Sequence, residues 1–485
     1  MIVQLWQPVN NQIKRFVVLV IEKKSQYSII FLSIIYCVIS ILLTLRTDEP
    51  IKTVIALWAL GILIFLYKIN RLYALCFVVF TIPLPIHLRY LERDAMTITT
   101  LLILILFLIE LIKGHIEFVR CGKATLIFAL LFVVVNSVTL FFNLKGDELL
   151  FNLRHYLSFL SSIMLYFLVI STINNKDEFN KILLLIGASL IIQVFVLILA
   201  SFQIRPSFFN IFTTRIGEFI TRETRPGGII DDYELIAEWF AVYIPFTFWL
   251  FYISQKKSFS IILIFMLLLG MMITRTRGAL FSLAFGIIIF FICFPSKNIL
   301  QRIKFIFSVL ALICTSLIII KAVFPAFYEV TILRILQTFQ LYAGGSSFDE
   351  IVNRQIIWQL FFDNYFTFNL LGSGRISPTS IRGYFHSLYF TLYYQTGLLG
   401  IISFGLFVIS IIILVGICCV QRSAHYEIRF LATVSLAIIF IFLIDEIKIE
   451  YLRGSCFSQY AWLFLGLVTL PSSFCRKLNS ISFLK

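Results

Sequence analysis

The chain has 485 residues, of which 60% are hydrophobic and 13% are charged, and its mean hydropathy is +0.98. A soluble domain carries about 25% charged residues and about 45–50% apolar ones. This composition excludes a soluble enzyme, a disordered chain and a disulfide scaffold, and it predicts a polytopic membrane protein. The nine cysteines form no C-x-x-C pattern, so we expect neither a metal site nor a disulfide framework.

A membrane-spanning helix needs roughly 20 apolar residues. Backbone polar groups in lipid must be satisfied within their own segment, so apolar runs of this kind predict helices rather than strands. We therefore expect an all-α polytopic membrane protein with about 14 transmembrane helices, forming a single membrane domain over residues 1–485. The predicted spans are 27–45, 51–67, 72–88, 97–112, 125–143, 155–172, 182–202, 233–252, 259–273, 279–294, 303–320, 387–420, 428–445 and 457–470. The run 387–420 is either one long helix or a re-entrant piece followed by a span.

The net charge of +15 lies on one predicted side of the membrane. With the N-terminus in the cytoplasm and sides alternating, 21 of the 40 Lys and Arg residues lie inside and 19 outside. Long loops cross a membrane largely regardless of charge. Without the two long external loops, 203–232 and 321–386, the comparison is 21 inside against 10 outside. This predicts cytoplasmic N- and C-termini, and the charge is an insertion signal rather than a nucleic-acid-binding face.

The external loop 203–232 is rich in arginine. It contains Arg205, Arg215, Arg222 and Arg225 and no lysine, and it ends in Pro226-Gly227-Gly228 followed by Asp231-Asp232-Tyr233. Arginine presents a planar fork of donors that matches phosphate oxygens. The loop therefore predicts a site for a polyanionic group near the membrane, with Arg222, Arg225 and Asp232 as substrate-binding candidates. The alternative is a solvated surface loop.

The larger external loop, 321–386, has a pattern of its own. Apolar residues at helical spacing predict two amphipathic helices, over 332–339 and 351–361, separated by a Gly-Gly-Ser-Ser break. A flexible turn, Leu371-Gly372-Ser373-Gly374-Arg375, follows them. We expect these helices to cover the outer face and to leave a cavity between the loop and the bilayer.

A short external turn, Thr274-Arg275-Thr276-Arg277-Gly278, places two arginines where the positive-inside bias disfavours them. Arg275 and Arg277 are therefore candidate phosphate ligands. Snorkelling of both side chains to lipid headgroups is the alternative.

His386 stands where the large loop re-enters the bilayer. An imidazole has an ordinary pKa near 6.5 and can act as general base for a sugar hydroxyl. A polar residue at a helix start is the alternative. His87 and His155 lie at outer helix ends without a motif around them, and we expect no catalytic role for either. Glu92-Arg93-Asp94 has the spacing of an acidic metal motif, but a solvated turn is the favoured interpretation.

The order of these pieces resembles that of the O-antigen ligase and polysaccharide polymerase (Wzy-type) superfamily over residues 200–415. The matching pieces are Arg225-Pro226-Gly227-Gly228, the Thr-Arg-Gly-Ala that begins at Thr276, Asn353-Arg354 with Trp358, Gly372-Ser373-Gly374, His386-Ser387-Leu388-Tyr389 and Gly397-Leu398-Leu399-Gly400.

The resemblance implies a GT-C-like membrane glycosyltransferase of the bacterial inner membrane, acting on the periplasmic side without a metal or other cofactor. Its donor would be a glycan on undecaprenyl pyrophosphate, and its acceptor a sugar hydroxyl of lipid A core or of another lipid-linked glycan. Arg225 and Arg277 match pyrophosphate-binding arginines, His386 matches the proposed base, and Arg354 matches a recurring loop arginine. Ligase and polymerase activity both remain open.

The alternative from another class is a lipid-linked oligosaccharide flippase. A transporter is expected to line a central cavity with charged side chains inside its spans. In the predicted topology almost all charged residues lie at span ends and in loops. We treat Glu110, near the inner end of its span, as the exception, and we expect an interfacial position for it.

Overall fold

The computed structural model describes residues 50–84, 86–90, 93–202, 204, 227–230, 232–253, 257–295, 299–325, 328–329, 332, 349–375, 385–421, 424–448, 451 and 455–482. The predicted span 27–45, most of the loop 203–232 and the predicted helix 332–339, apart from Ile332, lie outside the described residues.

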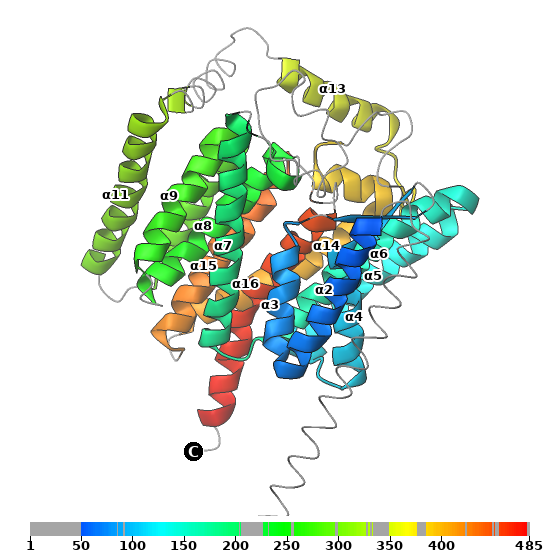
Figure 1. The fold of residues 1–485 in the computed structure, drawn as a ribbon, viewed down its shortest axis with the longest axis horizontal. Coiled ribbons are helices and arrows are strands. Elements are labelled where there is room, and N and C mark those ends of the chain that lie inside the picture. Colours follow the sequence, from blue (N-terminus) through cyan, green and yellow to red (C-terminus); the bar gives the residue numbers. More distant parts are fainter. Residues whose placement is uncertain are drawn as a thin grey trace, which may run out of the picture.

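Helices dominate the fold, and the predicted α-helical polytopic class is confirmed (Figure 1). In chain order the elements are α2 (Pro50–Ile69), α3 (Arg71–Thr81), β1 (His87–Tyr90), β2 (Arg93–Thr97), α4 (Ile98–Ile112), η1 (Phe118–Cys121), α5 (Lys123–Asn143), α6 (Gly146–Thr172), α7 (Lys176–Ser201), η4 (Gly228–Ile230), α8 (Tyr233–Tyr252), α9 (Lys257–Thr274), α10 (Arg277–Cys293), α11 (Ile299–Val323), α13 (Asp349–Asn364), α14 (Leu388–Val420), α15 (Tyr426–Asp445) and α16 (Ser455–Ser482).

Every predicted span in the described part of the chain coincides with a helix. Among the described residues, eight helices are at least 18 residues long and apolar enough to cross a membrane, and four shorter apolar stretches accompany them. The prediction for 72–88 was wrong at its C-terminal end: α3 stops at Thr81, and β1 pairs with β2 as an antiparallel hairpin. Pro83 and Pro85 follow α3 in the sequence, and proline disrupts a helix interior.

Two helices hold the bundle together. The helix α16 packs against α6, α14 and α15, and α15 packs against α8, α10 and α14. In Figure 1, α9 and α11 lie at the left of the bundle, α2 to α6 lie toward its right, and α7, α8, α15 and α16 lie between them. The helix α11 lies at the edge, where it contacts α9.

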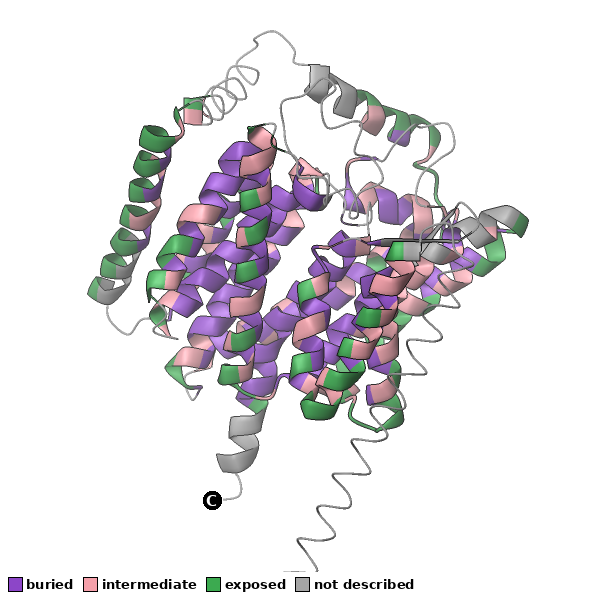
Figure 2. Ribbon diagram, in the orientation of Figure 1, coloured by how far each residue is buried: buried purple, intermediate pink, exposed green. Residues whose placement is uncertain are grey.

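The surface of the bundle is apolar, as a lipid-facing surface should be. Exposed side chains include Trp58 and Phe65 on α2 and Ile318 on α11. Figure 2 shows α11 exposed along its outer side, whereas α8, and α16 as far as Cys475, are buried almost throughout. A soluble protein rarely exposes apolar area on this scale.

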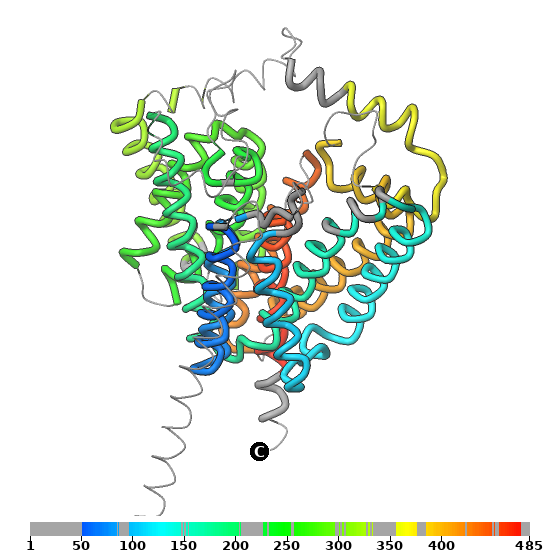
Figure 3. Tube along the Cα trace, turned by 45° about the vertical axis from the view of Figure 1, so that its right-hand side comes forward, coloured from blue at the N-terminus to red at the C-terminus, as the bar shows by residue number. Residues whose placement is uncertain are grey.

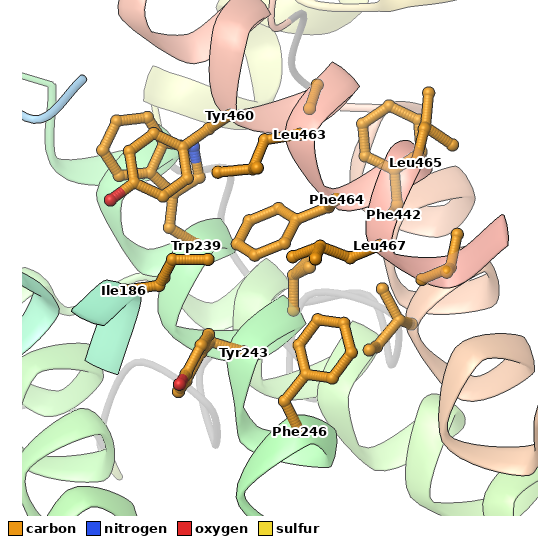
Figure 4. Packing of buried hydrophobic residues seen from close by; sticks show 14 of the residues in the cluster. Ile186, Trp239, Tyr243, Phe246, Phe442, Tyr460, Leu463, Phe464, Leu465 and Leu467 are labelled. Atoms are coloured by element: carbon orange, nitrogen blue, oxygen red, sulfur yellow. The ribbon is translucent and has the colours of Figure 1, made fainter. Parts of the chain in front are cut away.

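The core between α8 and α16 is aromatic (Figure 4). The rings of Trp239 and Tyr460 stack with centroids 3.8 Å apart, and Phe246 lies 6.2 Å from Phe464. Aromatic pairs stabilise a core beyond their buried area, by about 0.5–1.5 kcal/mol each.

In the described part of the chain, several connections predicted to be external meet at one end of the bundle, which we call the loop end. It carries the β1–β2 hairpin, the turn between α9 and α10, and α13. In both views α13 lies above the loop ends of α5, α6 and α14 (Figures 1 and 3). The predicted helix 351–361 of the large loop is confirmed by α13.

The helix α14 is broken at Gly397, where φ is +69° and ψ is −165°. Its pieces are therefore Leu388–Thr396 and Leu398–Val420, so of the two interpretations of 387–420 the uninterrupted helix was wrong. The strip 369–375 satisfies the backbone groups freed at the break. Ser373 and Gly374 donate to the carbonyls of Tyr394 and Gln395, at 2.7 and 2.9 Å, and Leu398 and Leu399 donate to those of Asn369 and Leu370, at 3.0 and 3.2 Å.

At the opposite end of the bundle, Glu110 lies two residues before the end of α4 and is buried, with 1% of its surface exposed. Its Oε2 lies 3.7 Å from Arg71 Nη1 and 3.6 Å from His115 Nδ1. A buried carboxylate needs such partners to offset its loss of hydration. We interpret this cluster as a structural clamp between α3 and α4.

Candidate active site

The turn of residues 274–278, which we call the arginine turn, joins α9 to α10 at the loop end. Arg275 adopts a left-handed backbone, with φ +54°, and its N–H donates to the carbonyl of Met272 at 3.1 Å. Thr276 is buried, and its hydroxyl donates to the carbonyl of Tyr233 at 3.3 Å, which ties the turn to the start of α8. The two arginines, both partly buried, therefore sit on a turn fixed by its neighbours.

Arg277 is the first residue of α10, and the first turn of that helix contains no acidic residue. A helix N-terminus carries partial positive charge and unpaired N–H groups, which favour an anion and disfavour a cation. A guanidinium here adds positive charge where it is least favourable for the helix itself. This arrangement favours a phosphate-binding role over that of a helix-stabilising side chain.

His386 is also left-handed, with φ +54°, and it precedes Ser387, the N-cap of α14. Among the described residues, Arg275 and His386 are the two non-glycine residues with a positive φ. Such conformations cost about 1–3 kcal/mol and gather at functional sites. Both had been selected as site candidates from the sequence.

The backbone on either side of His386 is anchored. Before it, the carbonyl of Phe385 accepts a hydrogen bond from Trp358 Nε1 of α13 at 3.1 Å, and the Phe385 ring packs on Phe361 with centroids 5.1 Å apart. After it, the N–H of Leu388 donates to the carbonyl of Glu446 at 2.9 Å. The histidine is therefore presented between two fixed points.

The C-terminal end of α15 links the histidine to the arginine turn. Besides the bond from Leu388 to Glu446, the carbonyl of Leu443 accepts from the hydroxyl of Tyr389 at 2.9 Å. Lys448 forms an ion pair with Asp445, with Nζ and Oδ1 2.5 Å apart. The Lys448 side chain also lies against Gly278, the last residue of the arginine turn. One segment, 443–448, thus contacts both predicted motifs.

A group of buried carboxylates lies at this end. Glu238, Asp445 and Glu446 are 3%, 0% and 0% exposed. In the sequence, Asp445 and Glu446 together with Glu450, Lys448 and Arg453 indicate a mutually neutralised interfacial cluster, and the ion pair of Lys448 with Asp445 agrees with part of it. Sequence reasoning missed Glu238, which lies in the second turn of α8 and is buried. The signal was available: Glu234 and Glu238 are one helical turn apart in an otherwise apolar run. Buried acids in membrane helices are costly and mark functional positions.

Tyr451 lies beside these carboxylates and is also buried. Its N–H donates to Glu446 Oε2 at 3.3 Å. Burial raises the pKa of the Tyr451 hydroxyl above its ordinary value, and the negative charge of Glu446 acts in the same direction. The phenol therefore stays protonated and can act only through hydrogen bonds.

Asp232 is the N-cap of α8. Its Oδ1 accepts hydrogen bonds from the N–H groups of Glu234 and Leu235, at 3.0 and 3.1 Å. This cap accounts for an aspartate at the position, since such caps stabilise a helix by about 1 kcal/mol. The role predicted for Asp232 in substrate binding stays a prediction.

Three other predicted residues cannot be placed by their side chains. Arg222 and Arg225 lie outside the described residues, and Arg354 is described only by its backbone, within α13. Within the described part of the chain no group of three or more His, Cys, Asp or Glu residues could hold a metal ion. Glu92 is outside the described residues, and the backbone of Arg93 and Asp94 belongs to β2.

These features define a multi-pass α-helical membrane protein with arginines, buried carboxylates and a conformationally constrained histidine at one end of its bundle. Residues 261–405 match the sequence model of the Wzy_C family, described as O-antigen ligase. The match confirms the resemblance inferred from the sequence, and it includes Arg275, Arg277, Arg354 and His386. No curated protein matches the chain.

Proposed function

We propose that this protein is a glycosyltransferase of the bacterial inner membrane that moves a glycan from undecaprenyl pyrophosphate to a sugar hydroxyl on the periplasmic side. The observation that carries the proposal is the pair of residues with a left-handed backbone, Arg275 and His386. Both lie in the stretch that matches the family model, and residues 443–448 contact the two motifs that contain them. The loop end would face the periplasm, and both termini would lie in the cytoplasm, as the 21-to-10 distribution of Lys and Arg favours.

The arginines would bind the leaving group. When the bond between the anomeric carbon and the phosphate oxygen breaks, the electron pair goes to the pyrophosphate, which gains negative charge. Arg277 and Arg275, with Arg225 and Arg222 from the preceding loop, would neutralise that charge at positions fixed before the reaction begins. Preorganised donors of this kind are often the largest contribution to catalysis. A metal is not needed where guanidinium groups supply the charge, and Arg354 would add a contact from α13.

His386 would act as the general base. It would take the proton of the acceptor hydroxyl while that oxygen forms the new bond to the anomeric carbon. A base of this kind must lie within hydrogen-bond reach of the proton that it removes. The anchoring of its backbone by Trp358 and Glu446 supports a fixed position for the imidazole.

The acceptor would be lipid A core for a ligase, or another lipid-linked glycan for an O-antigen or exopolysaccharide polymerase. The glycan profile of a deletion strain separates the two. Polymer that accumulates on the carrier lipid, with bare lipid A core, indicates a ligase; a single repeat on the core indicates a polymerase. An unchanged profile, with unchanged exopolysaccharide, would contradict both.

A lipid-linked oligosaccharide flippase is the other candidate. The buried acids found within the described helices, Glu110, Glu238 and Asp445, lie near helix ends rather than in the middle of the bundle, which favours a transferase. Reconstitution decides between them. A flippase moves donor lipid across a vesicle membrane without an acceptor, whereas a transferase requires the acceptor and makes a new glycosidic bond.

A further inference from the structure

The end of α13 and the chain that follows it carry exposed apolar side chains. Phe362, Phe366, Phe368 and Leu370, which we call the aromatic patch, are each more than half exposed, and Phe368 is 83% exposed. The rings of Phe362 and Phe366 lie 5.4 Å apart between centroids. In Figure 3 this segment descends from α13 at the outer edge of the bundle. Large apolar side chains that gather on a surface mark an interaction site.

The aromatic patch continues the lipid-facing side of α14. Beyond its break, this helix belongs to a candidate membrane span and exposes apolar side chains at the spacing of one helical face. They are Leu399, Ile402, Ile409, Ile413, Ile417 and Val420. The N–H of Leu399 donates to the carbonyl of Leu370 at 3.2 Å. The patch therefore begins where the apolar stripe of α14 ends.

A second lipid-facing helix meets the same segment. Asn143, the last residue of α5, donates through its side chain to the carbonyl of Gly372, two residues after Leu370. Phe141 and Phe142, just before it, are 56% and 74% exposed, and α5 is another candidate membrane span. The aromatic patch is thus continuous with the exposed apolar surface of two helices that would contact lipid.

The depth of the patch follows from the length of α14. Leu399 precedes Val420, the last residue of the helix, by 21 residues, a rise of about 32 Å at 1.5 Å per residue. The hydrocarbon core of a bilayer is about 30 Å thick. With Val420 at one surface of this core, Leu399 and the bonded Leu370 lie at the other surface, where acyl chains meet headgroups. Phenylalanine and leucine side chains of interfacial segments are buried at this level.

The charge of the segment favours lipid as the occupant. From Ile356 to Gly374 the sequence has one charged residue, Asp363, and neither lysine nor arginine. Attraction of basic side chains to anionic headgroups therefore cannot hold the segment, and burial of apolar surface must do so. We propose that the aromatic patch inserts into the membrane leaflet at the loop end, at the boundary between acyl chains and headgroups. This lipid contact does not depend on the proposed glycosyl transfer.

Photo-crosslinking tests the contact. The full chain carries p-benzoylphenylalanine in place of Phe368, in nanodiscs of phosphatidylcholine with or without phosphatidylglycerol, and mass spectrometry of the intact protein measures lipid adducts. The control position is Gln359, which is exposed on α13 and lies on the opposite side from the buried Phe361. We expect about tenfold more lipid adduct at residue 368 than at residue 359, since only the patch reaches acyl chains, and equal yields in both lipid mixtures. Ile409, on the lipid-facing side of α14, is the positive control.

The depth is tested with Phe368→Trp, which keeps an aromatic side chain. Lipids brominated near the headgroup should quench the fluorescence added by this tryptophan more strongly than lipids brominated at the end of the acyl chain. Absence of quenching by either lipid would overturn the inference. Absence of lipid adducts at residue 368, with normal adducts at residue 409, would do the same, as would equal adduct yields at residues 368 and 359. A crosslink from residue 368 to a second copy of the chain, in place of lipid, would instead assign the patch to a dimer interface and also overturn it.

Discussion

The side chain of Lys448 lies across the α-carbon of Gly278, and a Cβ built there would overlap its Cε and Nζ. Lys448 meanwhile reaches the buried carboxylate of Asp445 at 2.5 Å. Because Gly278 has no side chain, it leaves space for that of Lys448, which follows α15. This gives Gly278 a packing role in addition to its place in the turn.

Gly278→Ala should fold, because a flexible lysine can move aside, but it should separate Lys448 from Asp445 and lower transfer by about tenfold. If that displacement is the cause, Lys448→Ala should do similar damage, and the double variant should be no worse than Lys448→Ala alone. The measurement is a double-mutant cycle on kcat/KM. Additive losses would show that the two residues act independently.

Replacement of Arg277 tests the phosphate site. Arg277→Ala should reduce kcat by about 10²–10³-fold, the usual cost of losing a donor to developing negative charge. Arg277→Lys should also be impaired, since an ammonium group cannot supply the bidentate fork. Transfer is measured at matched membrane abundance. Full activity of both variants would leave this arginine a headgroup-binding side chain.

His386→Ala should insert normally and bind the donor lipid, yet transfer about 10²–10⁴-fold more slowly, because the acceptor hydroxyl must then attack without a base. His386→Gln should fail similarly, as an amide can hold the hydroxyl but cannot accept its proton. His87→Ala is the control, since no catalytic role is expected for that histidine. Turnover near the wild-type rate in His386→Ala, measured with purified protein and donor, would exclude it as the base.

The topology can be tested independently of activity. Reporter fusions at Lys257 and Lys297 should read as cytoplasmic, and a fusion near Gly345 should read as periplasmic, since the Lys and Arg count favours that orientation. A cytoplasmic reading at Gly345 would place the candidate site on the wrong side for a periplasmic transfer.

The glycines at the break in α14 should tolerate no side chain. A Cβ at Gly372 would overlap the backbone of Gln395, and one at Gly397 would lie 2.6 Å from the Leu370 carbonyl oxygen at a positive φ. Gly372→Ala and Gly397→Ala should each destabilise the protein by at least about 2 kcal/mol, because backbone cannot move aside as a side chain can. Thermal unfolding in detergent provides the measurement. Gly405→Ala, in the same helix with open space around it, should be neutral or slightly stabilising.

The spans were predictable because their signal is local. A run of apolar residues bounded by charges requires no knowledge of its neighbours, and α5, α8 and α15 begin and end within a few residues of the predicted bounds. The β1–β2 hairpin was not predictable in this way. Its residues resembled the end of one span followed by a loop. A strand is defined by its pairing with another strand, and neither segment alone indicates that pairing.

The residues of the candidate site also differ in whether local sequence is enough to predict them. Arg277 and His386 could be selected because each lies in a short motif at a helix start. The position of Glu238 in an otherwise apolar run could be read from the sequence, but its carboxylate neighbours could not. They depend on α15 packing against α8, which residue spacing along the chain does not indicate.

The hydrogen bonds of strip 369–375 have a mechanical consequence. Strip 369–375, which follows α13, is hydrogen-bonded to the backbone at the break in α14. This part of the large loop therefore cannot move away from α14 like a hinged lid. The helix α13 is held as well, since the Phe361 ring stacks on Phe390 of α14 with centroids 4.4 Å apart and the hydroxyl of Tyr393 donates to the carbonyl of Thr367. Because Trp358 donates to the carbonyl of Phe385, a tilt of α13 would pull directly on the peptide that precedes His386.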